Sequence, residues 1–331
     1  MSILDGKNIL VTGATGSFGK RFVRHVLEHH KPARLVIFSR DELKQFEMQQ
    51  QFQSPVLRWF LGDVRDTARL HRAFDGVQVV IHAAAMKQVP ASEYNPMEAI
   101  KTNIIGAENV INTCIDQGVE RVIALSTDKA ANPVNLYGAT KLCADKLFVA
   151  ANALSGKHRT RFSVVRYGNV IGSRGSVIPF FMQKKPGGVI PITDPRMTRF
   201  WITLGQGIEF VLAGLEAMRG GEIFIPKIPS MKVTEVAEVV APGCRQEIIG
   251  IRPGEKLHEI MITPDDALNT AEFARHFVIQ PAAHWWDQKA FLKTSGAKPV
   301  AEEFQYSSDR NGEWLSRPQL AEILKHEAIE L

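Results

Sequence analysis

The chain has 331 residues, of which 45% are hydrophobic and 23% charged, and its formal net charge is +5. This length suggests one large domain or two modest ones, and the composition argues against a disordered chain. No apolar run approaches the ~18 residues of a membrane span, and no block of Lys and Arg indicates nucleic-acid binding, so anionic small molecules such as nucleotides better explain the positive charge.

Short apolar runs alternate with amphipathic segments along the first half of the chain. Strands are expected at residues 8–13, 34–39, 56–63, 77–85, 121–127 and 161–169. Helices are expected between them, at residues 17–29, from 41, from 66, at about 96–117 and around 137–141. Strands that alternate with helices predict an α/β fold, in which helices cover both faces of a doubly wound parallel sheet.

The alternation stops after residue 169, where glycines and prolines become frequent. One more strand-like run, residues 222–227, is expected to rejoin the sheet. We therefore predict a sheet domain that binds the cofactor and a smaller C-terminal domain that binds the substrate. The predicted bounds are 1–169 with about 221–240 for the first domain, and about 170–220 with 241–331 for the second.

Cysteine and histidine positions give no sign of a metal site. Cys114, Cys143 and Cys244 lie far apart and are odd in number, so reduced thiols in a cytoplasmic protein are expected. His258 and Glu259 have no second pair at a suitable spacing, and we treat them as structural residues. The first residues enter a predicted strand almost at once, which leaves no room for a secretory leader.

The segment after the first strand is rich in glycine and opens the first helix, with the sequence VTGATGSFGK. Glycines there allow a tight turn and a close approach of the backbone, and the helix N-terminus offers N–H groups to a diphosphate. A plain turn is the alternative, but the strand–turn–helix context favours a Rossmann-type dinucleotide site. The residues expected to contact the cofactor here are Gly13, Thr15, Gly16, Ser17, Phe18 and Gly19.

The end of the second strand should select the cofactor, because NAD enzymes place an acidic residue there to hold the ribose. This chain has Ser39 and Arg40 at that position, with Lys44 one turn beyond Arg40. Cations suit the 2′-phosphate of NADP, so NADP is the predicted cofactor. The alternative is that Asp41 holds the ribose of NAD, but Asp41 is better explained as the cap of the next helix.

Two further strand ends complete the predicted cofactor site. Asp63 and Val64 follow the third strand, at the edge of the sheet where the adenine should lie. Ala83 begins a run of small residues after the fourth strand, which lets that strand end approach the cofactor. Lys87 follows and could direct an amine toward the crevice, although a single lysine is more often a surface residue.

Tyr137 and Lys141 are four residues apart on a predicted helix and therefore share one face. A phenol with a pKa near ~10 is a poor base at neutral pH. A nearby ammonium and a cationic nicotinamide should lower this pKa, so that Tyr137 can take the proton of a hydroxyl group during its oxidation. Tyr137 and Lys141 are both also expected to contact the cofactor, with Lys141 reaching the ribose of the nicotinamide.

Four segments resemble those of the extended short-chain dehydrogenases/reductases: TGATGSFG, STDKAANPVNLYGATK, RYGNVIGSRGSVIPFF and RPGEKLHE. Within that family they are similar to the inverting UDP-N-acetylglucosamine 4,6-dehydratases, which open pseudaminic acid synthesis. The similarity extends along nearly the whole chain. Retaining dehydratases have Thr-Asp-Glu where this chain has Thr127, Asp128 and Lys129.

The resemblance implies that NADP oxidises the sugar at C4, that water is eliminated across C5 and C6, and that hydride returns to C6 while C5 is reprotonated on the opposite face. For the elimination we assign Lys129 as the base at C5, Asp128 as the acid at the C6 hydroxyl, and Thr127 as a donor to the C4 oxygen. A lysine base at neutral pH needs a pKa about 3 units below its usual ~10.4. Burial and Lys141 would favour such a shift, and an ionised Asp128 would oppose it. The alternative is an ion pair of purely structural importance.

The resemblance also implies a site for UDP-N-acetylglucosamine. Asn169 should bind sugar or phosphate oxygens, and Val170 should lie near the nicotinamide. Arg199 and Arg252 resemble the diphosphate ligands of the family, where a guanidinium can bind two oxygens at once. Lys87 becomes a candidate contact of the sugar or ribose. Because the family forms oligomers, a homo-oligomer is expected.

Three other functions stay open at this point. They are a retaining 4,6-dehydratase, a 4-epimerase of a UDP-sugar, and a regulator that binds NADP without catalysis. Lys129 argues against the retaining enzyme, and the Asp128–Lys129 pair has no purpose in an epimerase. A regulator would be expected to have lost Tyr137 or one of the lysines, and the chain has retained them.

Overall fold

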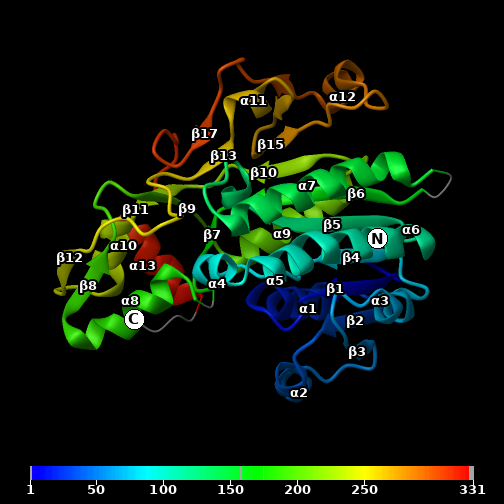
Figure 1. Ribbon diagram of the computed structural model, residues 1–331, viewed down its shortest axis with the longest axis horizontal. Coiled ribbons are helices and arrows are strands. Elements are labelled where there is room, and N and C mark those ends of the chain that lie inside the picture. The colour runs from blue at the N-terminus through cyan, green and yellow to red at the C-terminus, as the bar shows by residue number, and fades with distance from the viewer. Residues whose placement is uncertain (1, 157–158, 174, 328–331) are drawn as a thin grey trace.

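The computed structural model describes residues 2–156, 159–173 and 175–327 (Figure 1). Within these residues, the central sheet contains parallel strands in the spatial order β3 (Leu57–Leu61), β2 (Arg34–Ser39), β1 (Asn8–Thr12), β4 (Val79–His82), β5 (Arg121–Thr127), β6 (Arg161–Tyr167) and β10 (Ile223–Pro226). Antiparallel strands extend it beyond β10, in the order β15 (His276–Ile279), β14 (Thr270–Glu272) and β16 (Lys298–Pro299).

Helices cover both faces of this sheet (Figure 1). On one face, α9 (Leu204–Ala217) packs on β5 and β6 and contacts α1 (Ser17–His29). On the other face, α7 (Leu136–Leu154) packs on the same two strands and contacts α6 (Gly106–Asp116), which in turn contacts α3 (Thr67–Phe74). The predicted α/β fold with a doubly wound sheet is therefore confirmed.

The remaining elements near this sheet connect its strands. The stretch predicted as one helix at about 96–117 is interrupted, because a π-helical turn, η1 (Lys101–Ile105), lies between α5 (Pro96–Ile100) and α6. The others are α2 (Glu42–Gln51), α4 (Val89–Tyr94), the 3₁₀ turn η2 (Asp128–Ala130), α11 (Pro264–Ala267) and α12 (Gln288–Ser295). None of the helices in the described part of the chain is both long and apolar enough to cross a membrane.

A second apolar core lies beside the sheet, at the left of Figure 1. Its buried side chains include Ile178, Trp201, Val236 and Leu320. It is built from α8 (Val177–Lys184), α10 (Val233–Val240), α13 (Arg317–His326), β8 (Val189–Ile192) and β9 (Thr198–Ile202). Short strands and a turn complete the structure: β7 (Asn169–Val170), β11 (Ser230–Lys232), β12 (Arg245–Ile248), β13 (Ile260–Ile262), β17 (Tyr306–Ser307) and the turn η3 (Lys185–Gly187).

The predicted strand at 222–227 does rejoin the sheet, as β10. Two other segments do not pack with the domain to which the sequence analysis assigns them. Residues 270–299, which the sequence assigns to the smaller domain, form the antiparallel edge of the large sheet, whereas α10 packs into the second core. Short edge strands carry too few residues for a clear alternating pattern. The domain bounds stay a prediction.

Candidate active site

The glycine turn between β1 and α1 is shaped by residues that lack side chains. A Cβ atom on Gly13, whose φ is +66°, would lie 2.8 Å from the backbone nitrogen of Ala84. A Cβ atom on Gly19 would lie 2.4 Å from the backbone of Ala14. Gly16 precedes α1 and has no side chain to cap it, so the first N–H groups of the helix can face an anion. The turn therefore fits the diphosphate of a dinucleotide.

The end of β2 carries the side chains that should select the cofactor. Asp41 is the N-cap of α2 and accepts a hydrogen bond from the N–H of Lys44 at 3.0 Å, which confirms its interpretation as a helix cap. The side chain of Arg40 is more exposed than that of Asp41, and its guanidinium lies 3.6 Å from the carboxylate of Asp63. Burial raises the pKa of Asp63, but hydrogen bonds from Arg65 lower it below its ordinary value. An ionised Asp63 therefore holds Arg40 at this edge.

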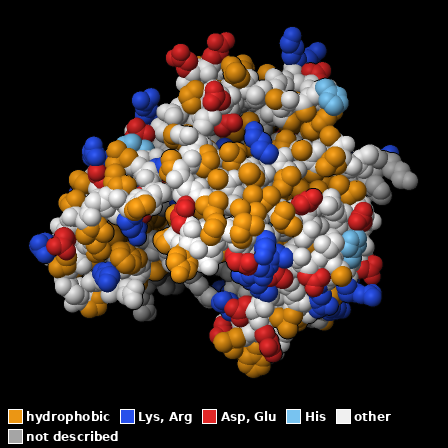
Figure 2. Space-filling model, viewed as in Figure 1, with side chains coloured by type: hydrophobic (Ala, Val, Ile, Leu, Met, Phe, Trp, Pro, Cys, Tyr) orange, Lys and Arg blue, Asp and Glu red, His pale blue; other side chains and the backbone are white. Residues whose placement is uncertain are grey.

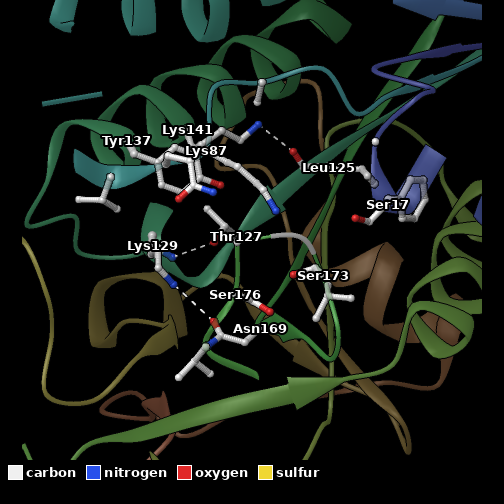
Figure 3. Close-up of a pocket in the computed structure, with 18 of the residues that line it drawn as sticks. Ser17, Lys87, Leu125, Thr127, Lys129, Tyr137, Lys141, Asn169, Ser173 and Ser176 are labelled. Atoms are coloured by element: carbon white, nitrogen blue, oxygen red, sulfur yellow. Dashed lines mark hydrogen bonds between the residues drawn. The ribbon is translucent and has the colours of Figure 1, made fainter. Parts of the chain in front are cut away.

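Tyr137 and Lys141 lie near the start of α7 and line the same cavity (Figure 3). The amine of Lys141 donates a hydrogen bond to the carbonyl oxygen of Leu125 at 2.8 Å, and burial lowers the pKa of this lysine. Burial raises the pKa of the Tyr137 phenol to about 12, and the strongest opposing effect comes from Lys129. The pKa of the phenol is thus raised rather than lowered, and Lys129 is the cation that acts most on it.

The turn η2 places Lys129 between carboxylates. The amine of Lys129 lies 3.1 Å from Asp128 and 3.1 Å from Glu259, and it donates a 3.5 Å hydrogen bond to Asn169 (Figure 3). Burial alone would lower the pKa of Lys129, but the two carboxylates raise it well above its ordinary value. The two carboxylates thus favour the ammonium form of Lys129, whereas the predicted base at C5 needs a lowered pKa.

Asp128 is fully buried behind Lys129. One carboxylate oxygen accepts hydrogen bonds from the hydroxyl of Thr127 at 2.9 Å and from Lys129 at 3.1 Å. The other oxygen has no hydrogen-bond partner among the described residues. Burial raises the pKa of Asp128 above its ordinary value, although Lys129 opposes this shift. A carboxyl group with a raised pKa is suited to donate a proton.

Glu259, which the sequence analysis treats as a structural residue, also belongs to this site. Its side chain is almost fully buried, and its carboxylate lies 3.6 Å from Arg199 and 3.8 Å from Lys256, in addition to Lys129. Burial raises the pKa of Glu259, but these three cations lower it below its ordinary value. Residues 129 and 259 meet only through the fold, so no local spacing could have identified the contact.

The predicted substrate residues differ in how their polar groups are engaged. The guanidinium of Arg199 donates hydrogen bonds to three backbone carbonyl groups and lies beside Glu259, so its donors are directed at the protein. Arg252 is exposed at the edge of the cavity, where it contacts Glu255. Lys87 points into the cavity in Figure 3, and burial lowers its pKa. Arg252 is thus better placed than Arg199 to reach a diphosphate.

One cavity of about 1100 Å³ brings the predicted residues together. Asp128 lies behind its wall, and the other predicted site residues line it. They are Gly13, Thr15, Gly16, Ser17, Phe18, Gly19, Ser39, Arg40, Lys44, Asp63, Val64, Ala83, Lys87, Thr127, Lys129, Tyr137, Lys141, Asn169, Val170, Arg199 and Arg252. The described residues include no cluster of three His, Cys, Asp or Glu side chains that could hold a metal. The individual roles of these residues stay predictions.

The first turn of α7 approaches η2 closely because Gly138 has no side chain. Asn135 caps the helix: it accepts a hydrogen bond from the N–H of Gly138 at 2.8 Å and donates one to the carbonyl group of Gly254 at 2.7 Å. A Cβ atom on Gly138 would lie 2.2 Å from the carbonyl oxygen of Lys129. This close approach fixes Tyr137 relative to Lys129.

Gly138→Ala is therefore expected to push α7 away from η2. Overpacking of this kind costs about 1–3 kcal/mol of stability, and the misplaced phenol should also lower turnover. Thermal unfolding checks the prediction, with Gly207→Ala on α9 as a matched control. A Cβ atom on Gly207 has no neighbour within 4 Å, so that change should leave the Tm unchanged or raise it. Equal Tm values for the two variants would contradict the close-contact argument.

A doubly wound sheet, a glycine turn and a Tyr-x-x-x-Lys pair in one cavity define the class of the short-chain dehydrogenases/reductases. Residues 9–281 match the polysaccharide biosynthesis protein family, and the chain belongs to this family of extended short-chain dehydrogenases/reductases. The resemblance found in the sequence is thus confirmed.

Relatives and solved structures extend over most of the chain. The UDP-N-acetylglucosamine 4,6-dehydratase (inverting) of Campylobacter jejuni is 57% identical over 330 residues, covering 98% of this chain and 99% of the relative. The UDP-glucose 4-epimerase of Rickettsia canadensis is 38% identical, covering 96% and 95%. The X-ray structure of Pen from Bacillus thuringiensis has a TM-score of 0.90 at 35% identity, covering 99% of this chain and 100% of that one.

Proposed function

We propose that the protein is a UDP-N-acetylglucosamine 4,6-dehydratase that inverts C5, a hydro-lyase that takes part in pseudaminic acid synthesis. Its product would be UDP-2-acetamido-2,6-dideoxy-β-L-arabino-hex-4-ulose. The observation that carries the proposal is that Lys129, paired with the buried Asp128 behind the wall, and the Tyr137–Lys141 pair meet at one cavity. The similarity to the inverting enzyme of Campylobacter jejuni supports it.

Each side chain then has a task in the reaction. Tyr137 takes the proton of the C4 hydroxyl. Thr127, whose hydroxyl donates to Asp128 in this structure, would turn from that carboxylate to donate a hydrogen bond to the C4 oxygen. Lys129, in the minor fraction that is a neutral amine, takes the proton from C5, which the neighbouring ketone has made acidic, and Asp128 gives a proton to the departing C6 hydroxyl. The glycine turn would hold NADP, which supplies hydride exchange at C4 and C6. The redox state of the cofactor is the same before and after the reaction.

NADP rather than NAD is proposed because Arg40 stands at the end of β2. Arg40→Ala is expected to weaken NADP binding by about tenfold, since a charge-assisted hydrogen bond contributes roughly 1.5–3 kcal/mol and this arginine is partly exposed. NAD lacks the 2′-phosphate, so its affinity should change little. Calorimetric titration of both cofactors measures the effect. An equal loss of affinity for NAD and NADP would contradict the assignment of NADP as the cofactor.

We also propose that the protein is a cytoplasmic homo-oligomer. Figure 2 shows apolar side chains gathered in the middle of the face that α4 to α7 form. Tyr94, Met97 and Leu154 on these helices and Ile105 in the turn η1 are exposed. Exposed apolar residues that gather on one face are typical of a subunit interface, and a second copy of the chain could cover them.

Incubation with UDP-N-acetylglucosamine in deuterated water, followed by NMR of the product, tests the proposed function. The expected product is a 6-deoxy-4-keto sugar with L-arabino configuration and deuterium at C5. A product with D-xylo configuration would instead identify a retaining dehydratase. The Rickettsia relative supports a 4-epimerase as the second candidate, which would invert only C4 and leave C5 free of deuterium. Cofactor binding without turnover of any UDP-sugar would indicate a regulator.

A further inference from the structure

Lys129 is held by a carboxylate that has no task in the proposed reaction. We infer that Glu259 is a positioning residue, which fixes the amine of Lys129 at the cavity wall and sets the pH range in which this amine can accept a proton. The inference rests on the proposed function, because it takes Lys129 as the base at C5. Glu259 itself acts only through Lys129.

The backbone of Glu259 is anchored on both sides of the side chain. Its N–H donates a hydrogen bond to the hydroxyl of Ser308 at 2.9 Å, and its carbonyl group accepts one from the N–H of Ser308 at 2.8 Å. Ser308 is fully buried and follows β17, which pairs with β13 directly after Glu259. The carboxylate that lies 3.1 Å from Lys129 is therefore carried by an anchored part of the fold.

The balance of charges around Lys129 depends on Glu259. Asp128 faces the amine from η2, Tyr137 from α7, Arg199 from β9, and Lys256 from the loop before β13. Without the charge of Glu259, the cations Lys129, Lys256 and Arg199 would face only Asp128, whose own pKa is raised by burial. Mutual repulsion in a buried site would then favour the neutral amine.

These charges predict the direction in which Glu259→Gln shifts the pH profile of proton removal at C5. A lysine accepts a proton only as the neutral amine, and the carboxylates raise the pKa of Lys129, so its neutral form is rare at neutral pH. The wild-type rate of proton removal at C5 should therefore keep rising toward alkaline pH. Glu259→Gln removes one negative charge at almost constant volume, which lowers the pKa of Lys129. The rising part of the rate profile should move to lower pH by about one to three units.

Two measurements test the inference. The first is the rate at which acetic anhydride modifies Lys129 as a function of pH, read by peptide mass spectrometry, with Lys87 in the same cavity as an internal reference. Because only the neutral amine reacts, Glu259→Gln should speed the modification of Lys129 about tenfold or more at a fixed pH. The second is the pH profile of deuterium incorporation at C5. Oxidation at C4, which Tyr137 assists, should not move to lower pH in the same variant, because a neutral Lys129 no longer lowers the pKa of the phenol.

Controls separate a positioning role from a merely structural one. Glu259→Asp keeps the charge and should return both readouts toward wild type, even if the Gln variant is less stable. In a Lys129→Ala background, Glu259→Gln should leave the pH profile of C4 oxidation unchanged. Glu302→Gln, the same substitution at an exposed position, should resemble wild type in both readouts.

The inference and the proposed function fail in different ways. Unchanged modification of Lys129 together with an unchanged C5 profile in Glu259→Gln would overturn the inference while the dehydratase stands. Absence of any C5 exchange in the wild-type protein would overturn the proposed function. The modification experiment would then still decide whether Glu259 controls the protonation of Lys129.

Discussion

Replacing Lys129 by alanine is expected to stop the reaction at the C4 ketone. The substitution removes the amine beside Asp128 but leaves Tyr137 and Lys141 on α7, so oxidation at C4 should continue. Proton removal by a positioned group contributes roughly 10²–10⁴-fold, and dehydration should fall by about that factor. Single-turnover reactions, quenched and reduced with borodeuteride, measure the outcome. The variant should give a sugar with deuterium at C4 and an intact C6 hydroxyl, and the wild type a 6-deoxy sugar.

Loss of the amine also leaves two buried carboxylates without their shared cation. Breaking a buried ion pair in this way costs about 3–5 kcal/mol, so the assay must be run well below the Tm of the variant. Lys129→Gln is a suitable second variant, because its amide can still donate hydrogen bonds to Asp128 and Glu259. Both variants should lack deuterium at C5. Deuterium incorporation at the wild-type rate in either one would refute the assignment of Lys129 as the base.

Local sequence patterns were enough to predict much of the site. The glycine turn, the cap formed by Asp41, and the Tyr137–Lys141 pair each depend on spacings within a single strand–turn–helix unit or helix. Their positions follow from helix periodicity and from the fact that the carboxyl ends of parallel strands meet at one edge of the sheet. The alternation of strands and helices predicted that sheet for the same reason.

Features that depend on contacts between distant segments could not be predicted. The direction of the pKa shift of Lys129 depends on Glu259, which reaches it only because β13 pairs with β17. The guanidinium of Arg199 is directed at backbone carbonyl groups of a separate loop, so its donors are less available to a diphosphate than its residue type suggested. Charge and hydrogen-bond partners of this kind are properties of the folded chain, and no periodicity encodes them.

Tyr137→Phe is expected to block the reaction one step earlier than Lys129→Ala does. The phenyl ring retains the packing of the tyrosine, but it has no hydroxyl group to take the proton from the C4 oxygen. Burial raises the pKa of Tyr137 to about 12, with Lys129 and a hydrogen bond between Tyr137 and Thr127 opposing the shift. The phenolate is therefore rare at neutral pH, and the substituted enzyme should lose roughly 10²–10⁴-fold in C4 oxidation.

Borodeuteride trapping should then yield no C4-labelled sugar from Tyr137→Phe, and no deuterium should enter C5, because the C5 proton becomes acidic only after the ketone has formed. Cofactor affinity measured by calorimetry should stay within about twofold of wild type, since Lys141 and the glycine turn are unchanged. A ketone trapped from this variant in wild-type yield would mean that another group takes the C4 proton. The Thr127 hydroxyl and the Lys129 amine both lower the pKa of the phenol, and they would then be the groups to replace next.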